Sequence, residues 1–94
     1  MREIETSAVF RKDFRRTLKN SRYRDVEPLF EQIVQALAED RELEIRFRDH
    51  ALLGHWNGYR ECHLKPDLLL IYKKTDNALL YLARLGSHSD LFAK

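Results

Sequence analysis

All four histidines of the chain lie in its second half, where imidazoles gathered in one place could do acid/base chemistry. They are His50, His55, His63 and His88, and they are accompanied in this half by Arg60, Asp67, Tyr72 and Arg84. The ordinary pKa of histidine is about 6.5, so one imidazole can accept a proton near neutral pH while another donates one. Each positioned acid or base is worth about 10² to 10⁴ in rate. We therefore expect a histidine-rich acid/base site between His50 and Phe92.

Cleavage of a phosphodiester in RNA fits this set of side chains. RNA carries its own nucleophile in the 2′-hydroxyl, so the protein need only move protons and stabilise charge. Arginine supplies fixed positive charge for a phosphorane-like transition state. Each histidine alone also fits an ordinary surface or core position, so the hypothesis depends on their grouping.

Three other kinds of site are less well supported. A metal site is an alternative because histidine and Asp67 are good ligands, but the chain has no HExxH or CxxC motif and its basic surroundings oppose a divalent cation. No GxSxG motif is present, and Ser87 beside His88 does not make a hydrolase triad. Strand alternation turns Cys62 away from His63, so we expect this thiol in the core.

The elements that would position the histidines read as strands joined by tight turns. The apolar pattern predicts three strands, over residues 59–64, 68–72 and 78–85. Short connections at residues 65–67 and 75–77 predict antiparallel hairpins, with the doubly apolar middle strand at the centre. Strand ends of such a meander can bring His63, Asp67 and His88 together. A short turn or helix is expected after Gly86.

Two helices are predicted in the first half. Phe10, Phe14 and Leu18 recur every four residues and indicate an amphipathic helix within residues 11–24, preceded by a short strand that includes Ile4 and residues 7–9. A second helix starts at the expected cap Asp25, and its apolar stripe comprises Val26, Leu29, Phe30, Ile33, Val34 and Leu37. The predicted fold class is α+β, with a short strand and a two-helix hairpin packed on an antiparallel sheet.

Composition and charge limit the class of protein. The 94 residues are 44% hydrophobic with three Gly and two Pro, which predicts one packed domain over residues 1–94. A single cysteine and the lack of a long apolar segment favour a cytoplasmic protein. Residues 1–24 hold eight basic and three acidic residues, whereas residues 25–44 hold one and seven. Such segregation suggests a basic face for a polyanion or an acidic partner, although ordinary solvated helix faces would give the same pattern.

The chain resembles the YafQ branch of the RelE/ParE superfamily of bacterial toxin–antitoxin toxins. The resemblance is carried by the stretch RDHALLGHWNGYRECHLKPDLLLIYKK, followed by LYLARLGSHSDLF. It covers nearly the whole chain, although residues 1–45 carry little that is diagnostic. It implies a RelE-like microbial ribonuclease fold and an endoribonuclease that cuts mRNA in the A site of the 70S ribosome. It also implies that the reaction needs no metal or cofactor, and that a cognate DinJ-like antitoxin silences the toxin.

The resemblance also implies roles for individual residues. The family's catalytic positions fall on His50, His63, Asp67 and His88, with Phe92 beside them, and Arg84 is expected to join the catalytic residues. By that pattern Asp67 or His63 takes the proton of the 2′-hydroxyl, His88 protonates the departing 5′-oxygen, and Arg84 neutralises the phosphate. The choice of base stays open, because a free aspartate is a weak base at neutral pH.

Further residues are expected to bind RNA. Phe92 offers a flat face for a base, with simple packing as the alternative, and Arg60 and Lys65 are candidate substrate-binding cations. The basic helix face would contact ribosomal RNA phosphates through Arg11, Lys12, Arg15, Arg16 and Lys19. We expect Trp56 and Tyr59 to be core aromatics, and His55 has no counterpart in the family pattern.

Two other functions compete with the nuclease. One is a non-enzymatic, ParE-like toxin that inhibits gyrase, and the other is a plain RNA-binding module. A gyrase-directed relative would not be expected to keep His50, His63, Asp67 and His88 together. A binding module predicts that replacing His88 leaves RNA affinity and biological effect unchanged.

Overall fold

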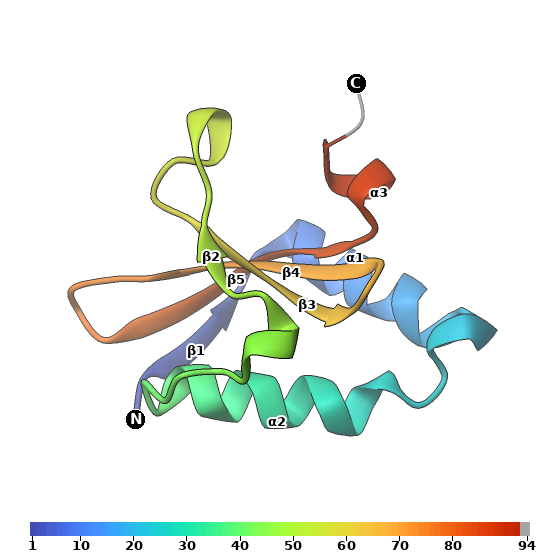
Figure 1. Cartoon of the computed structure of the whole chain (residues 1–94), viewed down its shortest axis with the longest axis horizontal. Coiled ribbons are helices and arrows are strands. Elements are labelled where there is room, and N and C mark those ends of the chain that lie inside the picture. The colour runs from blue at the N-terminus through green and yellow to red at the C-terminus, as the bar shows by residue number, and fades with distance from the viewer. Residues whose placement is uncertain (93–94) are drawn as a thin grey trace.

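A five-stranded sheet forms the centre of the structure, with one long helix on one face, a short helix on the other and a second long helix alongside (Figure 1). The computed structural model describes residues 1–92 and confirms the predicted α+β class. Its strands are β1 (Glu3–Thr6), β2 (His50–Ala51), β3 (Arg60–Lys65), β4 (Leu68–Lys74) and β5 (Leu79–Gly86). Its helices are α1 (Ala8–Lys19), α2 (Val26–Ala38) and α3 (His88–Phe92), with single 3₁₀ turns η1 (Ser21–Tyr23), η2 (Ile45–Phe47) and η3 (Gly54–Trp56).

The sheet is mixed rather than wholly antiparallel. Its strand order is β1-β5-β4-β3-β2, so β4 is central, as its apolar residues on both faces predict. The β3–β4 and β4–β5 pairs are the expected antiparallel hairpins, whereas β1 pairs with β5 in parallel. Such a pairing joins distant parts of the chain, so no local pattern in the sequence predicts it.

The first helix begins earlier than the sequence predicts. Residues 7–9 were expected in the first strand, but Ser7 caps α1. The Ser7 hydroxyl accepts a hydrogen bond from the Phe10 amide at 2.8 Å and donates one to the Ala83 carbonyl at 2.7 Å. One small side chain therefore ends β1, starts α1 and ties both to β5.

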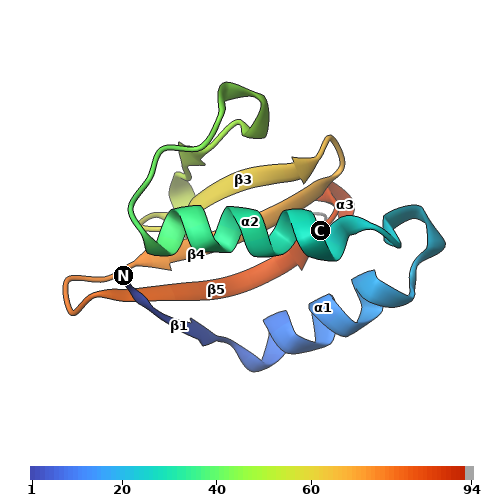
Figure 2. The same ribbon diagram turned by 90° about the horizontal axis from the view of Figure 1, so that it is seen from below.

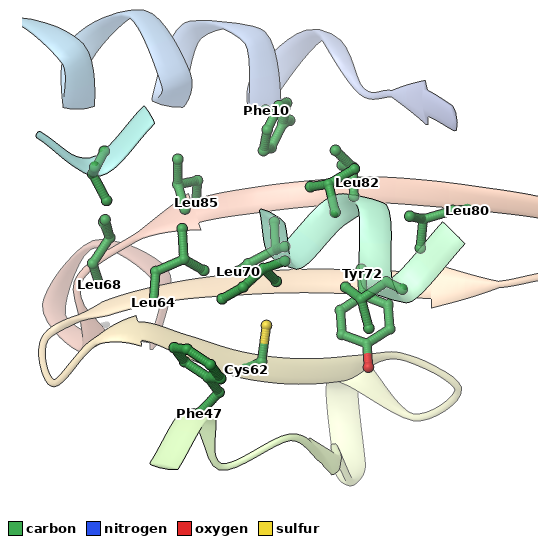
Figure 3. Close-up of a cluster of buried hydrophobic side chains, with 14 of the residues drawn as sticks. Phe10, Phe47, Cys62, Leu64, Leu68, Leu70, Tyr72, Leu80, Leu82 and Leu85 are labelled. Carbon is green, nitrogen blue, oxygen red and sulfur yellow. The ribbon is translucent and has the colours of Figure 1, made fainter. Parts of the chain in front are cut away.

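Helix α2 lies over one face of the sheet, and α1 runs alongside β5 and packs against the same core (Figure 2). Phe10, Phe14 and Phe30 pack together between them, with ring centroids 4.9–5.9 Å apart. Figure 3 shows Phe10 pointing from α1 toward β5 within this core, which also takes in Cys62 of β3. Burial of one such large apolar side chain contributes about 1.5–3 kcal/mol, so the core fixes the sheet against both helices.

The second helix starts where the sequence predicts, but without the predicted cap. Asp25 is the N-cap residue of α2, yet its side chain makes no capping hydrogen bond. Val26, Ile33 and Leu37 are buried against the sheet, as the apolar stripe requires. Packing, rather than capping, therefore holds this helix in place.

The opposite face of the sheet carries a smaller apolar cluster. Leu69, Ile71, Ala83 and Leu91 form it, with Leu52, Trp56, Tyr59 and Tyr81 packed around them. The η3 loop and α3 both rise on this side in Figure 1, away from α2. No helix in the described part of the chain is long and apolar enough to span a bilayer.

Candidate active site

Strand β3 places an acidic residue and a histidine on the sheet face that α1 and α2 leave uncovered. Glu61 lies opposite Ile71 and His63 lies opposite Leu69 in the β3–β4 register. Both polar residues are nearly buried, with Glu61 4% and His63 9% exposed as whole residues. Cys62, between them, points into the helix-side core as predicted, where burial raises the pKa of its thiol.

The Glu61 carboxylate joins two of the predicted catalytic histidines. Its Oε2 atom lies 3.1 Å from Nε2 of His50 and 3.4 Å from Nε2 of His63. His50 is held on its other side as well, because its Nδ1 atom lies 2.8 Å from the Arg48 carbonyl oxygen. The second carboxylate oxygen, Oε1, is buried without a hydrogen-bond partner among the described residues. Glu61 therefore orients both imidazoles at the cost of one unsatisfied buried acceptor.

The rings of three histidines and one phenylalanine form a continuous row. Ring centroids are 6.5 Å apart for His50 and His63, 5.8 Å for His63 and His88, and 5.8 Å for His88 and Phe92. His88 and Phe92 are the first and last residues of α3. The structure therefore brings together three of the predicted catalytic residues and the predicted base-stacking residue.

A reciprocal cap fixes the start of α3. The Ser87 hydroxyl accepts from the Asp90 amide at 3.1 Å, and the Asp90 carboxylate accepts from the Ser87 amide at 3.1 Å. The second of these bonds lowers the pKa of Asp90. At Gly86 a Cβ atom would lie 3.0 Å from Cβ of Asp90, so this close approach favours glycine. The cap thereby fixes the backbone at His88.

Arg84 lies on the histidine face in the same cross-strand row as Glu61. Ile71 of β4 pairs with Glu61 on one side and with Arg84 on the other. Adjacent strands lie about 4.8 Å apart, so the two backbones are separated by about 10 Å. The guanidinium is bound by Asp13 of α1, through Nε at 2.8 Å and Nη2 at 3.3 Å. Hydrogen bonding to Asp13 raises the pKa of Arg84, so this side chain is a permanent cation.

Asp67 is a predicted catalytic residue that makes no contact with the histidines in the described part of the structure. It lies exposed in the β3–β4 turn, and its carbonyl oxygen accepts a hydrogen bond from the Tyr23 hydroxyl at 3.1 Å. Within residues 1–92 its carboxylate makes no hydrogen bond or ion pair with an imidazole. It lines a small pocket together with Ser87 and Asp90, beside the start of α3.

The two predicted substrate-binding cations lie at opposite ends of β3. Arg60 is engaged by Asp49, with Nε 3.3 Å from Oδ1, and Asp49 also accepts from the Tyr72 hydroxyl. Lys65 lines a groove of about 400 Å³ that reaches His63, and the other lining residues are Leu29, Arg46, Phe47, Arg48, Leu64 and Pro66. Of these two cations, Lys65 therefore borders a groove that also contacts His63, whereas Arg60 does not.

The five basic side chains predicted for ribosomal RNA are all exposed on α1. Two of them also make contacts within the protein. Arg11 donates to the Thr6 carbonyl at 2.9 Å, and Arg16 contacts Asp13 at 3.1 Å. Trp56 and Tyr59 were expected in the core, but they are partly buried and pack edge to face, with centroids 5.1 Å apart, against the smaller apolar cluster.

Glu61 and Asp13 are site residues that the sequence reasoning missed. Alternation places Glu61 on the same strand face as His63, and this was the available signal. Asp13 lies on the buried side of α1, between Phe10 and Thr17. In residues 1–92, no three His, Cys, Asp or Glu side chains are grouped so that they could hold a metal ion.

Known proteins resemble this chain over almost its full length. Residues 2–93 match the family model of the bacterial toxin YafQ of type II toxin–antitoxin systems. The mRNA interferase toxin YafQ of Escherichia coli K12 is 38% identical over 91 residues, which cover 97% of this chain and 96% of the relative. A crystal structure of the E. coli DinJ–YafQ complex matches with a TM-score of 0.84 at 38% identity, covering 98% and 99% of the two chains. A metal-bound toxin from Helicobacter pylori matches with a TM-score of 0.88 at 45% identity, covering 98% and 100%.

Proposed function

The chain belongs to the YafQ family of type II toxins and is an endoribonuclease of the mRNA interferase kind, and we propose that it cuts mRNA in the ribosomal A site by metal-independent acid/base catalysis. The observation that carries the proposal is the row of His50, His63 and His88, which ends at Phe92 on one open sheet face. In this proposal residues 1–94 act as one toxin domain in the cytoplasm, where mRNA is translated.

The reaction is a transesterification within the RNA. The 2′-oxygen forms a bond to the phosphorus atom as its proton leaves, and the bond from phosphorus to the 5′-oxygen breaks as that oxygen gains a proton. The products are a 2′,3′-cyclic phosphate and a free 5′-hydroxyl. Two proton-transfer groups and one fixed cation suffice, and no redox partner is involved.

The geometry favours His63 as the base and His88 as the acid. His63 lies between His50 and His88 in the row of rings and is oriented by the Glu61 carboxylate. Asp67 makes no such contact, so we assign it to binding or orienting the RNA at the β3–β4 turn. His50, held between a carbonyl and a carboxylate, stabilises charge beside the base.

The RNA would lie across the open face, between the groove at Lys65 and Phe92. Phe92 is 38% exposed beside His88, so its ring is free to stack on a base next to the scissile phosphate. The exposed cations of α1 supply the salt-sensitive attraction to ribosomal RNA.

A cognate antitoxin is the proposed inhibitor. The E. coli relative has been crystallised as a complex with DinJ, and we propose a DinJ-like antitoxin for this chain. An acidic segment that folds onto the cationic surface would suit the charge of α1. Such a segment would prevent ribosome and antitoxin from binding there at the same time.

Primer extension on mRNA held in programmed 70S ribosomes tests the proposed function. Wild type should cut within the A-site codon, and His88→Ala and His63→Ala should each slow the cut by about 10² to 10⁴. Asp67→Ala should raise the ribosome concentration needed for half-maximal rate more than it lowers the maximal rate. Failure of the wild-type protein to cut would overturn the proposed A-site cleavage. Wild-type rates for both histidine variants would instead overturn the assignment of acid and base.

Metal independence needs its own test, because ribosomes require Mg²⁺ and the H. pylori relative has been crystallised with metal. A sulfur atom can replace either non-bridging oxygen at the scissile phosphate. If no metal contacts that oxygen, added Mn²⁺ or Cd²⁺ should not restore the rate of the slowed substrate. Restoration by these thiophilic ions would show that a metal participates.

A further inference from the structure

Helix α1 runs beside β5, and one of its acidic residues contacts the edge of β5 beyond the segment that pairs with β1. The Asp13 side chain is 2% exposed. Its Oδ2 atom accepts from Nε of Arg84 at 2.8 Å and from the Leu85 amide at 3.0 Å. Its Oδ1 atom accepts from Nη2 of Arg84 at 3.3 Å and from Nη2 of Arg16 at 3.1 Å. Each oxygen of this buried carboxylate thus accepts two hydrogen bonds.

The contact with Asp13 orients Arg84 rather than merely neutralising it. Asp13 takes the Nε and Nη2 side of the guanidinium, and Nη1 makes no hydrogen bond within the described residues. A β-bulge precedes Arg84, because Ile71 pairs with Arg84 while Tyr72 pairs with Leu82. Bulges re-aim side chains near active sites. The free Nη1 edge therefore remains available to a phosphate on the histidine face.

Arg16 extends the same network to α3. Its Nη2 atom lies 3.8 Å from Oδ2 of Asp90, the atom that accepts from the Ser87 amide. Helix α3 has five residues, and only Leu91 among them is buried. A helix this short is not stable by itself, so its position depends on such anchors. Arg16 thus links α1 to the turn that carries His88.

We propose that Asp13 and Arg16 are positioning residues of the nuclease site: Asp13 aims Arg84 at the scissile phosphate, and Arg16 fixes α3 and with it His88. The inference rests on the proposed function and adds two residues that lie behind the open face. It also gives Arg16 a structural task besides any contact with ribosomal RNA. If Asp13 and Arg16 only stabilised the fold, replacing them would lower the free energy of unfolding and leave kcat unchanged.

Three variants distinguish a positioning role of these residues from an effect on folding and from a general effect of charge. Asp13→Asn keeps the shape of the side chain but turns one acceptor into a donor, which then faces the guanidinium or the Leu85 amide. Arg16→Gln removes the link to α3. Arg15→Gln removes the same charge from the same helix, and Arg15 makes no ion pair within residues 1–92, so it measures the effect of charge alone.

The measurements are kcat and half-saturating ribosome concentration in the A-site assay, with NMR of the Arg84 Nε–H and His88 ring signals in the intact protein. We expect Asp13→Asn to lower kcat about 10- to 100-fold and to shift the Arg84 signal. Arg16→Gln should lower kcat and shift the His88 signal. Arg15→Gln should raise the half-saturating concentration at low salt and leave the His88 signal in place.

Two results would overturn the inference. One is a folded Asp13→Asn protein with wild-type kcat and an unchanged Arg84 signal. The other is an Arg16→Gln protein that matches Arg15→Gln in kcat and in the His88 signal, and this comparison decides the matter if Asp13→Asn does not fold. Failure of wild type to cut would instead contradict the proposed function. The NMR comparison would then still show whether these residues position Arg84 and His88.

Discussion

Replacing Glu61 by leucine should leave the stability of the protein almost unchanged while it damages the active site. The Glu61 side chain is 5% exposed, and its Oε1 atom lacks a partner within residues 1–92. A buried polar atom left unsatisfied costs about 1–3 kcal/mol. Exchanging a whole buried ion pair for well-packed apolar residues is often neutral or stabilising by about 1–4 kcal/mol, whereas removing one partner alone is destabilising. Leucine would add to the apolar cluster around Leu69 and Ile71 but would leave the nearly buried His63 ring without its acceptor, so we expect the free energy of unfolding to change by no more than about 1 kcal/mol.

The catalytic effect should be much larger. Without Glu61 neither His50 nor His63 keeps its shared acceptor at 3.1 and 3.4 Å, and the two rings become free to rotate. Loss of orientation of this kind costs about 10- to 100-fold in rate.

Urea unfolding and the A-site assay, run on the same preparations, check both effects. Glu61→Gln, which keeps the shape but not the charge, is the matched control. A loss of more than about 2 kcal/mol in Glu61→Leu would refute the unsatisfied-acceptor reasoning. Cutting at the wild-type rate would refute the orienting role of Glu61.

Three further predictions concern single groups. Burial raises the pKa of the Cys62 thiol, so iodoacetamide at pH 8 should label the urea-unfolded chain and not the native protein, as mass spectrometry would show. Hydrogen bonds from Lys74 and Arg2 lower the pKa of Asp40 from its ordinary 3.8 to about 2. This stabilisation is present above pH 3.8 and lost as the pH falls through about 2, so the Tm difference between wild type and Asp40→Asn should disappear over that range in calorimetry. Ser87→Ala removes the cap of α3, worth about 1 kcal/mol, and should speed hydrogen exchange at the Asp90 amide and slow cleavage with little change in Tm.

Short-range patterns in the sequence were enough to predict the strands, turns and helix that position the site. Alternation separated Cys62 from His63, and short turns predicted the two hairpins that the structure contains. The helix-side core follows from the apolar stripe of α2. These features depend on neighbours a few residues apart, which is the range over which periodicity is informative.

Pairing between distant residues was harder to predict. The parallel pairing of β1 with β5 and the reach of Asp13 to Arg84 join residues more than 70 positions apart. Glu61 was overlooked for a different reason, since acidic residues are seldom buried. Asp67, expected in the site by resemblance, has its carboxylate at the surface of a turn, and its role remains a prediction for the assay.

The pairing of β1 with β5 also affects how the toxin is made. Strand β1 finds its partner only after residues 79–82 exist, so most of the chain must be synthesised before the sheet can close. Arg84, His88 and Phe92 follow that segment. Asp13 can form its ion pair only once Arg84 has been synthesised. A nascent or truncated chain that lacks β5 therefore has no assembled site. Such a dependence on distant contacts slows folding.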